Sequence, residues 1–310
     1  MAEQLYQRDV YGHTLVELGK QNKDIVVLDA DLSGSTRTAI FAKEFPDRFF
    51  NFGVAEQNMV AASAGLASCG KTVFVSTFAI FATGRAWDQV RNSVCYSNFN
   101  VKIVATHAGL TVGPDGATHQ ALEDIALMRV LPNMSIIVPC DGPQTREAVL
   151  AAAGHNGPFY VRLGRAKVPT IENKGEFRLG KAQVLTSGND LAIIACGVMV
   201  TEALAAVKVL SEIGIKVRLI NMHTIRPLDT NEILKAARET KGIIVCEEHS
   251  VIGGLASSVQ EVVAEEYPTK VACLGVKNRF GQSGDPVELL KEYNLTSADI
   301  EKAALKLLSK

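Results

Sequence analysis

Short apolar runs alternate with longer segments of helical periodicity along the first half of the chain. We expect strands at 25–30, 72–77, 102–107, 135–140 and 159–164. Helical patterns lie between these runs, for example at 54–70 and 142–155. Near-continuous apolar strands separated by helices are typical of a parallel sheet that is covered on both faces, so the pattern predicts an α/β fold.

The alternation stops in a less regular stretch and then begins again. Residues 165–190 are rich in Lys, Gly and polar residues, which favours a crossing between domains. The later pattern predicts strands at 191–196, 216–222, 242–248 and 270–276, and helices at 200–214, 230–240 and 257–267. We therefore predict two parallel-sheet α/β domains, at 1–170 and 191–310, joined by a linker at 171–190.

Composition and charge exclude several classes of protein. The 310 residues are 47% hydrophobic and 21% charged with a net charge of −1, which is ordinary for a globular protein and gives no broad attraction to nucleic acid. The apolar stretches are much shorter than the ~20 residues that span a bilayer. The N-terminal residues are charged throughout and do not resemble an export signal. We expect a cytoplasmic protein without nucleic-acid or membrane partners.

The cysteines lie tens of residues apart and form no C-x-x-C pair. Several stand inside apolar runs, so we interpret them as small buried side chains rather than as metal ligands or disulfides. The six are Cys69, Cys95, Cys140, Cys196, Cys246 and Cys273.

Residues 51–124 combine polar side chains with glycines, and three of them have two interpretations each. Glu56 opens a helix of small apolar residues, where a carboxylate can cap the helix or can face the nitrogen of a buried ligand. Phe78 and Phe81 are one helical turn apart just after a strand. Such a pair is usually part of a core, and the alternative is a platform for a ligand.

Two histidines and an aspartate follow the strand predicted at 102–107. His107 ends that strand, and the glycine-rich loop after it carries Asp115 and His119. Loops after parallel strands are where α/β sheets bind ligands, and these residue types are poor core material. No His-x-x-x-His helix or carboxylate cluster accompanies them, so we predict a ligand site without a metal ion on this chain.

The order of these motifs resembles the pyrimidine-binding and C-terminal domains of the transketolase family. The resemblance covers about residues 5–305 and includes VLDADLSGSTRT, NFGVAEQN, STFAIFATGRAWDQVR, LPNMSIIVPCD and INMHTIRPLD. The most specific motif is GPDGATHQ, which is close to the family form G-x-D-G-x-T-H-Q. The resemblance implies a thiamine diphosphate-binding fold followed by a smaller domain of the transketolase C-terminal type.

The resemblance also implies a binding site for the aminopyrimidine of thiamine diphosphate. Glu56 would hydrogen-bond N1′ of the ring, Phe78 and Phe81 would pack on its face, and Asp31 would lie near the pocket. A proton shared between Glu56 and N1′ favours the imino form of the ring, so this carboxylate would be catalytic. The family often has a third aromatic residue in this segment, where this chain has Gly84.

Sugar binding is implied for a second set of residues. His119 would contact the donor sugar as a catalytic group, and Asp115 would contact a hydroxyl of the acceptor. The sugar phosphate would be held by Arg8, Ser35, His107 and Arg165. Arginine forks and a histidine bind a phosphate dianion through charge-assisted hydrogen bonds, whereas the arginines taken alone could equally form surface ion pairs.

The diphosphate-binding motif of this family is missing from the sequence. That motif is G-D-G followed further along by an asparagine, and it holds Mg²⁺ and the diphosphate. No G-D-G occurs here. We therefore expect the Mg²⁺ ligands on a separate N-terminal subunit, and a self-dimer of this chain that binds two such subunits as a heterotetramer.

The function implied is that of the C-terminal subunit of a two-chain transketolase, which moves a two-carbon ketol unit from a ketose phosphate to an aldose phosphate. The alternatives are another thiamine diphosphate enzyme, such as a deoxyxylulose-phosphate-synthase-like protein or a 2-oxo acid dehydrogenase beta subunit, and a non-catalytic interaction subunit. Glu248 and His249 look like a catalytic pair, but the family uses that region for assembly, so we leave both out of the predicted site.

Overall fold

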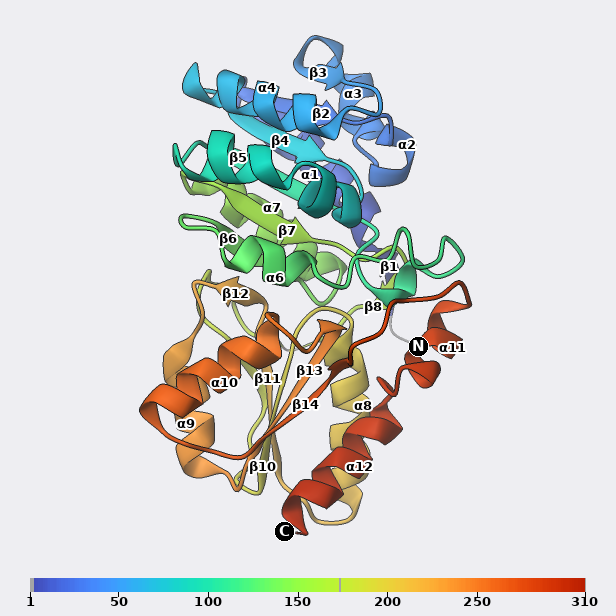
Figure 1. Cartoon of the computed structure of the whole chain (residues 1–310), viewed down its shortest axis with the longest axis vertical. Helices are drawn as coiled ribbons and strands as arrows, with labels where there is room; N and C mark the ends of the chain where they lie inside the picture. The colour runs from blue at the N-terminus through green and yellow to red at the C-terminus, as the bar shows by residue number, and fades with distance from the viewer. Residues whose placement is uncertain (1–2, 173, 310) are drawn as a thin grey trace.

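The computed structural model describes residues 3–172 and 174–309, and it contains two α/β units stacked end to end (Figure 1). The outermost residues of the two predicted domains, 1–2 and 310, and residue 173 of the predicted linker lie outside the described residues. None of the described helices is both long and apolar enough to cross a membrane.

The first unit is built on a seven-stranded sheet. Its strands β2, β3, β4, β5, β7 and β6 are parallel, and β12 is antiparallel at one edge. The order across the sheet is β12 (Thr224–Arg226), β6 (Ser135–Ile137), β7 (Phe159–Arg162), β5 (Val101–Ala105), β4 (Thr72–Ser76), β2 (Ile25–Asp29) and β3 (Phe49–Asn51).

Helices cover both faces of this sheet, as the continuous apolar strands predict. One face packs against α1 (Gln7–Gln21), α3 (Ala39–Glu44) and α7 (Gly142–Gly154). The opposite face packs against α4 (Glu56–Ser68), α5 (Trp87–Gln89), α6 (Asp124–Arg129) and two π-helical turns, Phe81–Arg85 and Val90–Cys95. A short helix, α2 (Ser33–Thr36), follows β2, and β1 (Gln4–Tyr6) pairs with β8 (Lys167–Pro169).

The second unit is a five-stranded sheet with helices on both sides. Its order is β14 (Val271–Val276), β13 (Ile243–Ser250), β10 (Leu191–Ala195), β11 (Val217–Asn221) and β9 (Gln183–Thr186). Only β9 is antiparallel. The flanking helices are α8 (Met199–Glu212), α9 (Thr230–Glu239), α10 (Leu255–Glu266), α11 (Pro286–Glu292) and α12 (Ser297–Leu308).

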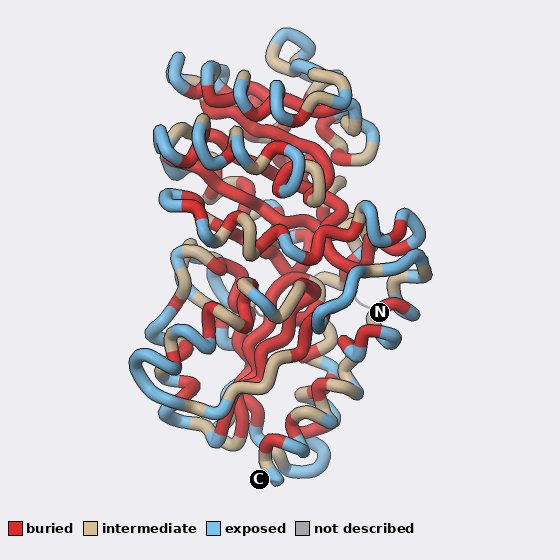
Figure 2. Tube along the Cα trace, viewed as in Figure 1, coloured by how far each residue is buried: buried red, intermediate tan, exposed pale blue. Residues whose placement is uncertain are grey.

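The two units share one core. The central strands of both sheets are buried along their length, while many exposed positions lie on the outer turns of the helices (Figure 2). One apolar cluster runs from Val26 and Met59 in the first unit to Ile194 and Leu255 in the second. The second unit therefore supports the first sheet, and the candidate site follows the carboxyl ends of that sheet's parallel strands.

The fold class predicted from the sequence is confirmed, and five short strands were not anticipated: β1, β3, β8, β9 and β12. Strand β12 lies within the predicted second domain but pairs with β6 of the first sheet, and β9 lies within the predicted linker but pairs with β11. Both are too short for alternation to reveal them. The domain limits stay a prediction.

Candidate active site

Most of the predicted site residues follow the carboxyl ends of neighbouring parallel strands. Asp31 and Ser35 follow β2, Phe78 and Phe81 follow β4, the segment His107–His119 follows β5, and Arg165 follows β7. Strands β2, β4, β5 and β7 are adjacent and parallel, so these segments emerge on the same side of the sheet. His107 and Asp31 have left-handed backbones, with φ of 59° and 64°, a conformation that non-glycine residues adopt mainly at functional sites.

Glu56 is the first residue of α4 and is buried, with 1% of its surface exposed. Its Oε2 accepts a hydrogen bond from Nη1 of Arg85 at 2.7 Å. No hydrogen bond from the described residues reaches Oε1, and α4 has no side-chain cap at its N-terminus. The carboxylate therefore has one oxygen available to a ligand, and the capping interpretation is not what the contacts favour.

Phe78 and Phe81 form an aromatic cluster with the two histidines. The rings of Phe78 and Phe81 are nearly parallel with centroids 6.0 Å apart, and His107 stacks on Phe78 at 3.8 Å. The edge of His119 meets Phe81 at 5.5 Å. The guanidinium of Arg85 lies 4.6 Å from the centre of the Phe81 ring, so this arginine joins the aromatic cluster to Glu56.

Gly84 lies in the π-helical turn that follows Phe81. A Cβ at this position would have no heavy atom within 4 Å, so open space surrounds it. A π turn contains one more residue than an α turn, and such turns are frequent at functional sites. The structure leaves room here for an aromatic side chain but supplies none.

The second part of the site is positively charged. Burial lowers the pKa of His107 to about 3, and the charges of Arg8 and Arg165 and of His119 act in the same direction. Arg8 donates from Nη1 to the carbonyl of Ser35 at 3.3 Å, and Arg165 donates to the carbonyl of Val112 at 2.8 Å. Neither arginine pairs with a carboxylate within the described residues. Two cations around a neutral histidine are suited to a phosphate dianion.

Two predicted site residues are not joined to this cluster by a contact. Asp31 is exposed and accepts a long hydrogen bond from Asn51, with Nδ2 to Oδ1 at 3.5 Å. Asp115 is exposed at the tip of its loop, and no hydrogen bond or ion pair of the described residues reaches its carboxylate. The roles of both residues stay predictions.

The loop that carries Asp115 and His119 is held by the second unit. Buried Gln120 donates from Nε2 to the carbonyls of Leu110 and Gln282, at 3.1 and 2.9 Å. Ser283 donates to the carbonyl of Pro114 at 2.7 Å. Two of these contacts, from Gln120 to Gln282 and from Ser283 to Pro114, join segments more than a hundred residues apart, so the C-terminal unit positions the loop as well as completing the core.

Glu248 reaches the same loop from β13. Its carboxylate accepts from the backbone N–H of Thr111. A Cβ on Gly109, where φ is 82°, would stand 2.4 Å from the Glu248 carboxyl carbon, so only glycine fits there. Glu248 and His249 are both buried, and within the described residues neither forms a hydrogen bond or ring contact with the aromatic cluster.

Sequence analysis missed two residues that shape the site, Arg85 and Gln120, and it considered a third, Glu248, but left it out. Arg85 and Gln120 lie inside two quoted motifs, STFAIFATGRAWDQVR and GPDGATHQ, so a charged or amide side chain there was a visible signal. Glu248 is 137 residues from Thr111, and no local pattern reveals such a contact.

The cysteine prediction holds for four of the six side chains. Cys95, Cys140, Cys196 and Cys246 are buried, and this burial raises the pKa of each of their thiols. Cys69 is exposed and Cys273 is half-buried, because they lie at a helix end and on an edge strand. Within residues 3–172 and 174–309, His, Cys, Asp and Glu form no group of three or more that could hold a metal ion.

The low pKa of His107 predicts a pH effect on stability. An unfolded chain protonates this histidine below about pH 6.5, whereas the folded chain does not until about pH 3. The unfolded state therefore binds more protons in that window, and the free energy of unfolding falls as the pH falls, by at most about 1.4 kcal/mol for each pH unit.

His107→Asn should remove this contribution. We expect the loss of thermal stability between about pH 7.5 and about pH 5 to be smaller in the variant than in the unmodified chain. His13→Asn, at an exposed position on α1, serves as the control and should behave as the unmodified chain does. Equal losses in all three proteins would mean that His107 is charged in the folded chain.

Comparison with known proteins decides the family. The model of the transketolase pyrimidine binding domain matches residues 3–170, and that of the transketolase C-terminal domain matches residues 180–300. The chain belongs to the transketolase family. It is 50% identical to a protein of Methanocaldococcus jannaschii named as a putative transketolase C-terminal section, over 98% of this chain and 96% of that one.

Two further likenesses define which part of a transketolase this is. A solved structure titled as the inactive beta4 tetramer of a split gene transketolase is 51% identical with a TM-score of 0.92, covering 98% of this chain and 99% of that chain. Human transketolase is 39% identical over all of this chain, but the match covers 50% of the human protein. The chain thus corresponds to the C-terminal section of a transketolase.

Proposed function

We propose that this chain is the C-terminal subunit of a two-chain transketolase that moves a two-carbon ketol unit from a ketose phosphate to an aldose phosphate. The observation that carries the proposal is the joining of buried Glu56 to the aromatic and histidine cluster through Arg85. That arrangement combines a carboxylate, flat rings and cations in one site, as a cofactor ring and a phosphorylated sugar require.

The residues present fit the aminopyrimidine of thiamine diphosphate. Glu56 offers Oε1 to a ring nitrogen, and Phe81 is only half-buried, so part of its ring remains accessible. When bound, thiamine diphosphate supplies the carbanion chemistry that breaks and makes the carbon–carbon bond. In this proposal Glu56 holds a proton at the pyrimidine N1′, Phe78 and Phe81 pack on the ring, and Asp31 borders the pocket.

Sugar recognition is assigned to the other half of the site. His119 contacts the donor sugar and moves protons at its hydroxyl oxygens, and Asp115 binds a hydroxyl of the acceptor. Arg8, Ser35, His107 and Arg165 bind the terminal phosphate. Neutral His107 donates one N–H, while the two arginines supply the positive charge.

A second polypeptide completes the site in this proposal. Mg²⁺ and the diphosphate are assigned to an N-terminal subunit because the G-D-G motif does not occur in this sequence. Two large apolar side chains in the segment before Glu56 are exposed, Val54 at 73% and Phe50 at 46%, as expected of a contact surface. The related split-gene beta chain forms an inactive tetramer, which agrees with a self-associating chain that needs a partner.

Reconstitution tests the proposal directly. The purified chain with Mg²⁺ and thiamine diphosphate should not transfer the ketol unit from xylulose 5-phosphate to ribose 5-phosphate, and addition of the N-terminal subunit from the same source should start the reaction. Turnover by the chain alone would refute the two-chain assignment. A stable complex without this transfer would keep the thiamine diphosphate assignment and move the search to another donor, such as that of a deoxyxylulose-phosphate synthase.

Phosphate recognition is tested by Arg165→Ala in the reconstituted enzyme. Loss of a charge-assisted hydrogen bond should raise KM for phosphorylated sugars about 10- to 100-fold and leave KM for unphosphorylated sugars unchanged. Arg178→Ala is the matched control, because Arg178 is an exposed arginine paired with Glu176. An equal rise for both kinds of sugar would place the phosphate elsewhere.

A further inference from the structure

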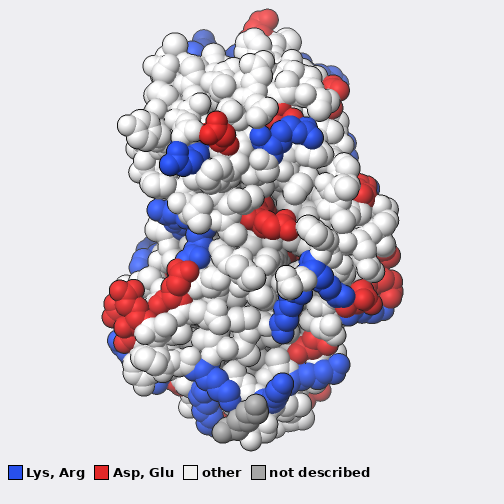
Figure 3. All heavy atoms as spheres, in the orientation of Figure 1, with Lys and Arg blue, Asp and Glu red and all other residues white. Residues whose placement is uncertain are grey.

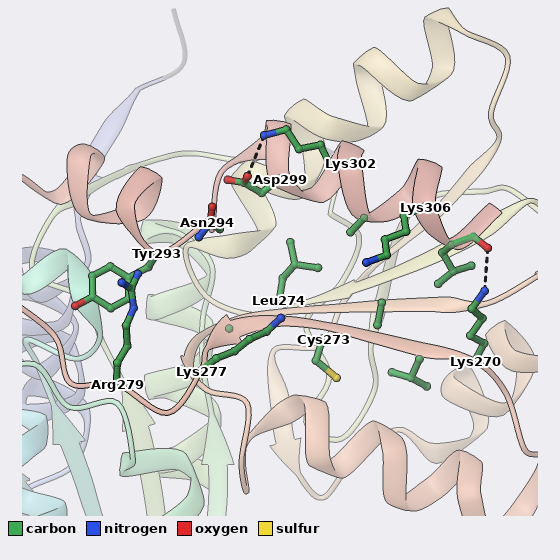
Figure 4. A pocket seen from close by; sticks show the side chains of 15 residues that line it. Lys270, Cys273, Leu274, Lys277, Arg279, Tyr293, Asn294, Asp299, Lys302 and Lys306 are labelled. Atoms are coloured by element: carbon green, nitrogen blue, oxygen red, sulfur yellow. Dashed lines mark hydrogen bonds and ion pairs between the residues drawn. The ribbon is translucent and has the colours of Figure 1, made fainter. Parts of the chain in front are cut away.

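A groove of about 550 Å³ runs between β14 and α12, at the edge of the second sheet (Figure 4). All residues from Lys270 to Gly275 line it. Side chains alternate between the two faces of a strand, so a continuous run of lining residues means that the groove follows the backbone edge. It lies on the second unit, away from the candidate active site, and the proposed function does not use it.

Strand β14 has an open side along this groove. It pairs with β13 in parallel and is the last strand of its sheet, and no strand of the described residues pairs with its other side. Alternate N–H and C=O groups of an edge strand point away from its partner and can pair with an added strand. The strand, VACLGV, contains no charged residue and no proline, so nothing in it blocks such pairing.

Positive charge surrounds this open edge. The groove is lined by five cations and one carboxylate, that of Asp299; the cations are Lys270, Lys277, Arg279, Lys302 and Lys306. In a chain whose net charge is −1, this is a local excess, and Lys and Arg are prominent on this face of the second unit (Figure 3).

Within the described residues three of these cations have no carboxylate partner: Lys277, Lys306 and Lys270, whose Nζ donates to the carbonyl of Leu307 at 3.2 Å. Lys302 lies 3.5 Å from Asp299, and Arg279 lies 3.3 Å from Glu292. Lys277 and Lys306 have no carboxylate within 4.0 Å in the part of the chain that the structure describes. Figure 4 shows both side chains extending into the space between α12 and β14. An anionic ligand in the groove would neutralise these charges.

The spacing of the cations indicates what shape of ligand can contact all of them. Lys270 and Lys277 flank the six residues of β14, so they are about 20 Å apart along the strand. Lys302 and Lys306 are one turn apart on α12, which forms the opposite wall. A single phosphate cannot reach both ends of such a row, whereas an extended chain can.

We propose that this groove binds an extended, acidic segment of another polypeptide, which adds to the second sheet as a strand beside β14. Its backbone pairs with the open edge, and its carboxylates meet the lysines at the ends of β14 and on α12. Lysines on an edge strand usually prevent pairing, but here the charges flank the strand and leave its backbone open.

A labelled peptide tests the proposal on the full purified chain. The probe is a short fluorescein-labelled peptide in which glutamate alternates with valine, and binding is followed by fluorescence anisotropy. We expect saturable binding that the double change Lys302→Glu and Lys306→Glu weakens at least about tenfold. The matched control, Lys208→Glu with Lys235→Glu, reverses two exposed lysines of the same unit outside the groove and should leave binding unchanged.

A second peptide separates strand pairing from simple ion exchange. The same sequence with a central proline keeps its charge but loses a backbone donor, so it should bind about tenfold more weakly. Equal binding of the two peptides, equal losses in both double variants, or no binding at all would overturn the proposal. Displacement by inorganic pyrophosphate at low concentration would instead identify a small-anion site. A change of oligomeric state in Lys302→Glu with Lys306→Glu would identify a second copy of this chain as the occupant.

Discussion

Glu56→Gln should reduce ketol transfer by the reconstituted enzyme about 10²- to 10⁴-fold, the range expected for loss of a general acid–base group. Glutamine has the same shape but cannot hold the proton that the aminopyrimidine N1′ needs. The side chain is buried and is joined to the aromatic cluster through Arg85. Among the described residues no other carboxylate contacts that cluster, so none can replace Glu56.

The measurement is kcat at saturating Mg²⁺, thiamine diphosphate and sugar phosphates, with circular dichroism to check the fold. Glu265→Gln, an exposed glutamate on α10, is the control and should retain full activity. Loss of activity with an unchanged complex between the two subunits identifies a chemical role. If Glu56→Gln keeps kcat within about twofold, well below the effect of an acid–base group, the assignment of Glu56 to N1′ is wrong.

Arg85 makes a related contribution that the sequence did not predict. It donates to Glu56 and lies over Phe81, so it keeps the buried carboxylate paired when no ring is bound. A cofactor nitrogen approaching Glu56 would use the oxygen that Arg85 leaves open or displace the arginine, whose side chain is 44% exposed. One oxygen of the Glu56 carboxylate is therefore available without any rearrangement of Arg85.

Periodicity was enough to predict the sheet and the positions of its strand ends. The run IVVLD and the small-residue helix that begins at Glu56 have the limits expected of them within a residue or two. The resemblance assigned His107, Phe78 and Arg165 to one active site, and in the structure all three follow parallel strands that end at a common edge.

Contacts between the two units could not be predicted in the same way. Gln120 bonds to Gln282, and Glu248 bonds to Thr111, across more than a hundred residues in each case. Hydrophobic alternation reports the face of an element and not its partner in another sheet. The sequence analysis therefore assigned the second domain mainly to assembly, whereas its residues also hold the loop that carries His119.

A buried ion pair between Arg162 and Asp124 lies where the second unit contacts the loop that carries His119. Nε of Arg162 on β7 donates to Asp124 at 2.7 Å, and Nη2 donates to the carbonyl of Glu248 at 3.0 Å. Tyr160 donates to the same carboxylate at 2.6 Å. Burial acts to raise the pKa of Asp124, but the charges of Arg162 and His249 and these hydrogen bonds outweigh it and lower the pKa.

Arg162→Met should therefore destabilise the chain by about 3–5 kcal/mol, the cost of leaving a buried charge unpaired. The thioether fills part of the space but leaves Asp124 with Tyr160 as its remaining hydrogen-bond donor, so the carboxylate must take up a proton or admit water. The measurement is urea unfolding of the purified chain. Arg178→Met breaks an exposed pair and should leave the urea midpoint nearly unchanged.

The double variant Arg162→Met with Asp124→Leu distinguishes an unpaired charge from lost packing. When both partners are replaced by apolar groups of similar size, most of the stability should return, because no buried charge remains. The Glu248 carbonyl would still lack the hydrogen bond that Arg162 donates, so the loop from Thr111 to His119 should be less ordered. Recovery of stability without recovery of kcat in the reconstituted enzyme is the expected result. It would show that the junction positions the active-site loop in addition to holding the two units together. Recovery of both would confine the ion pair to a structural role.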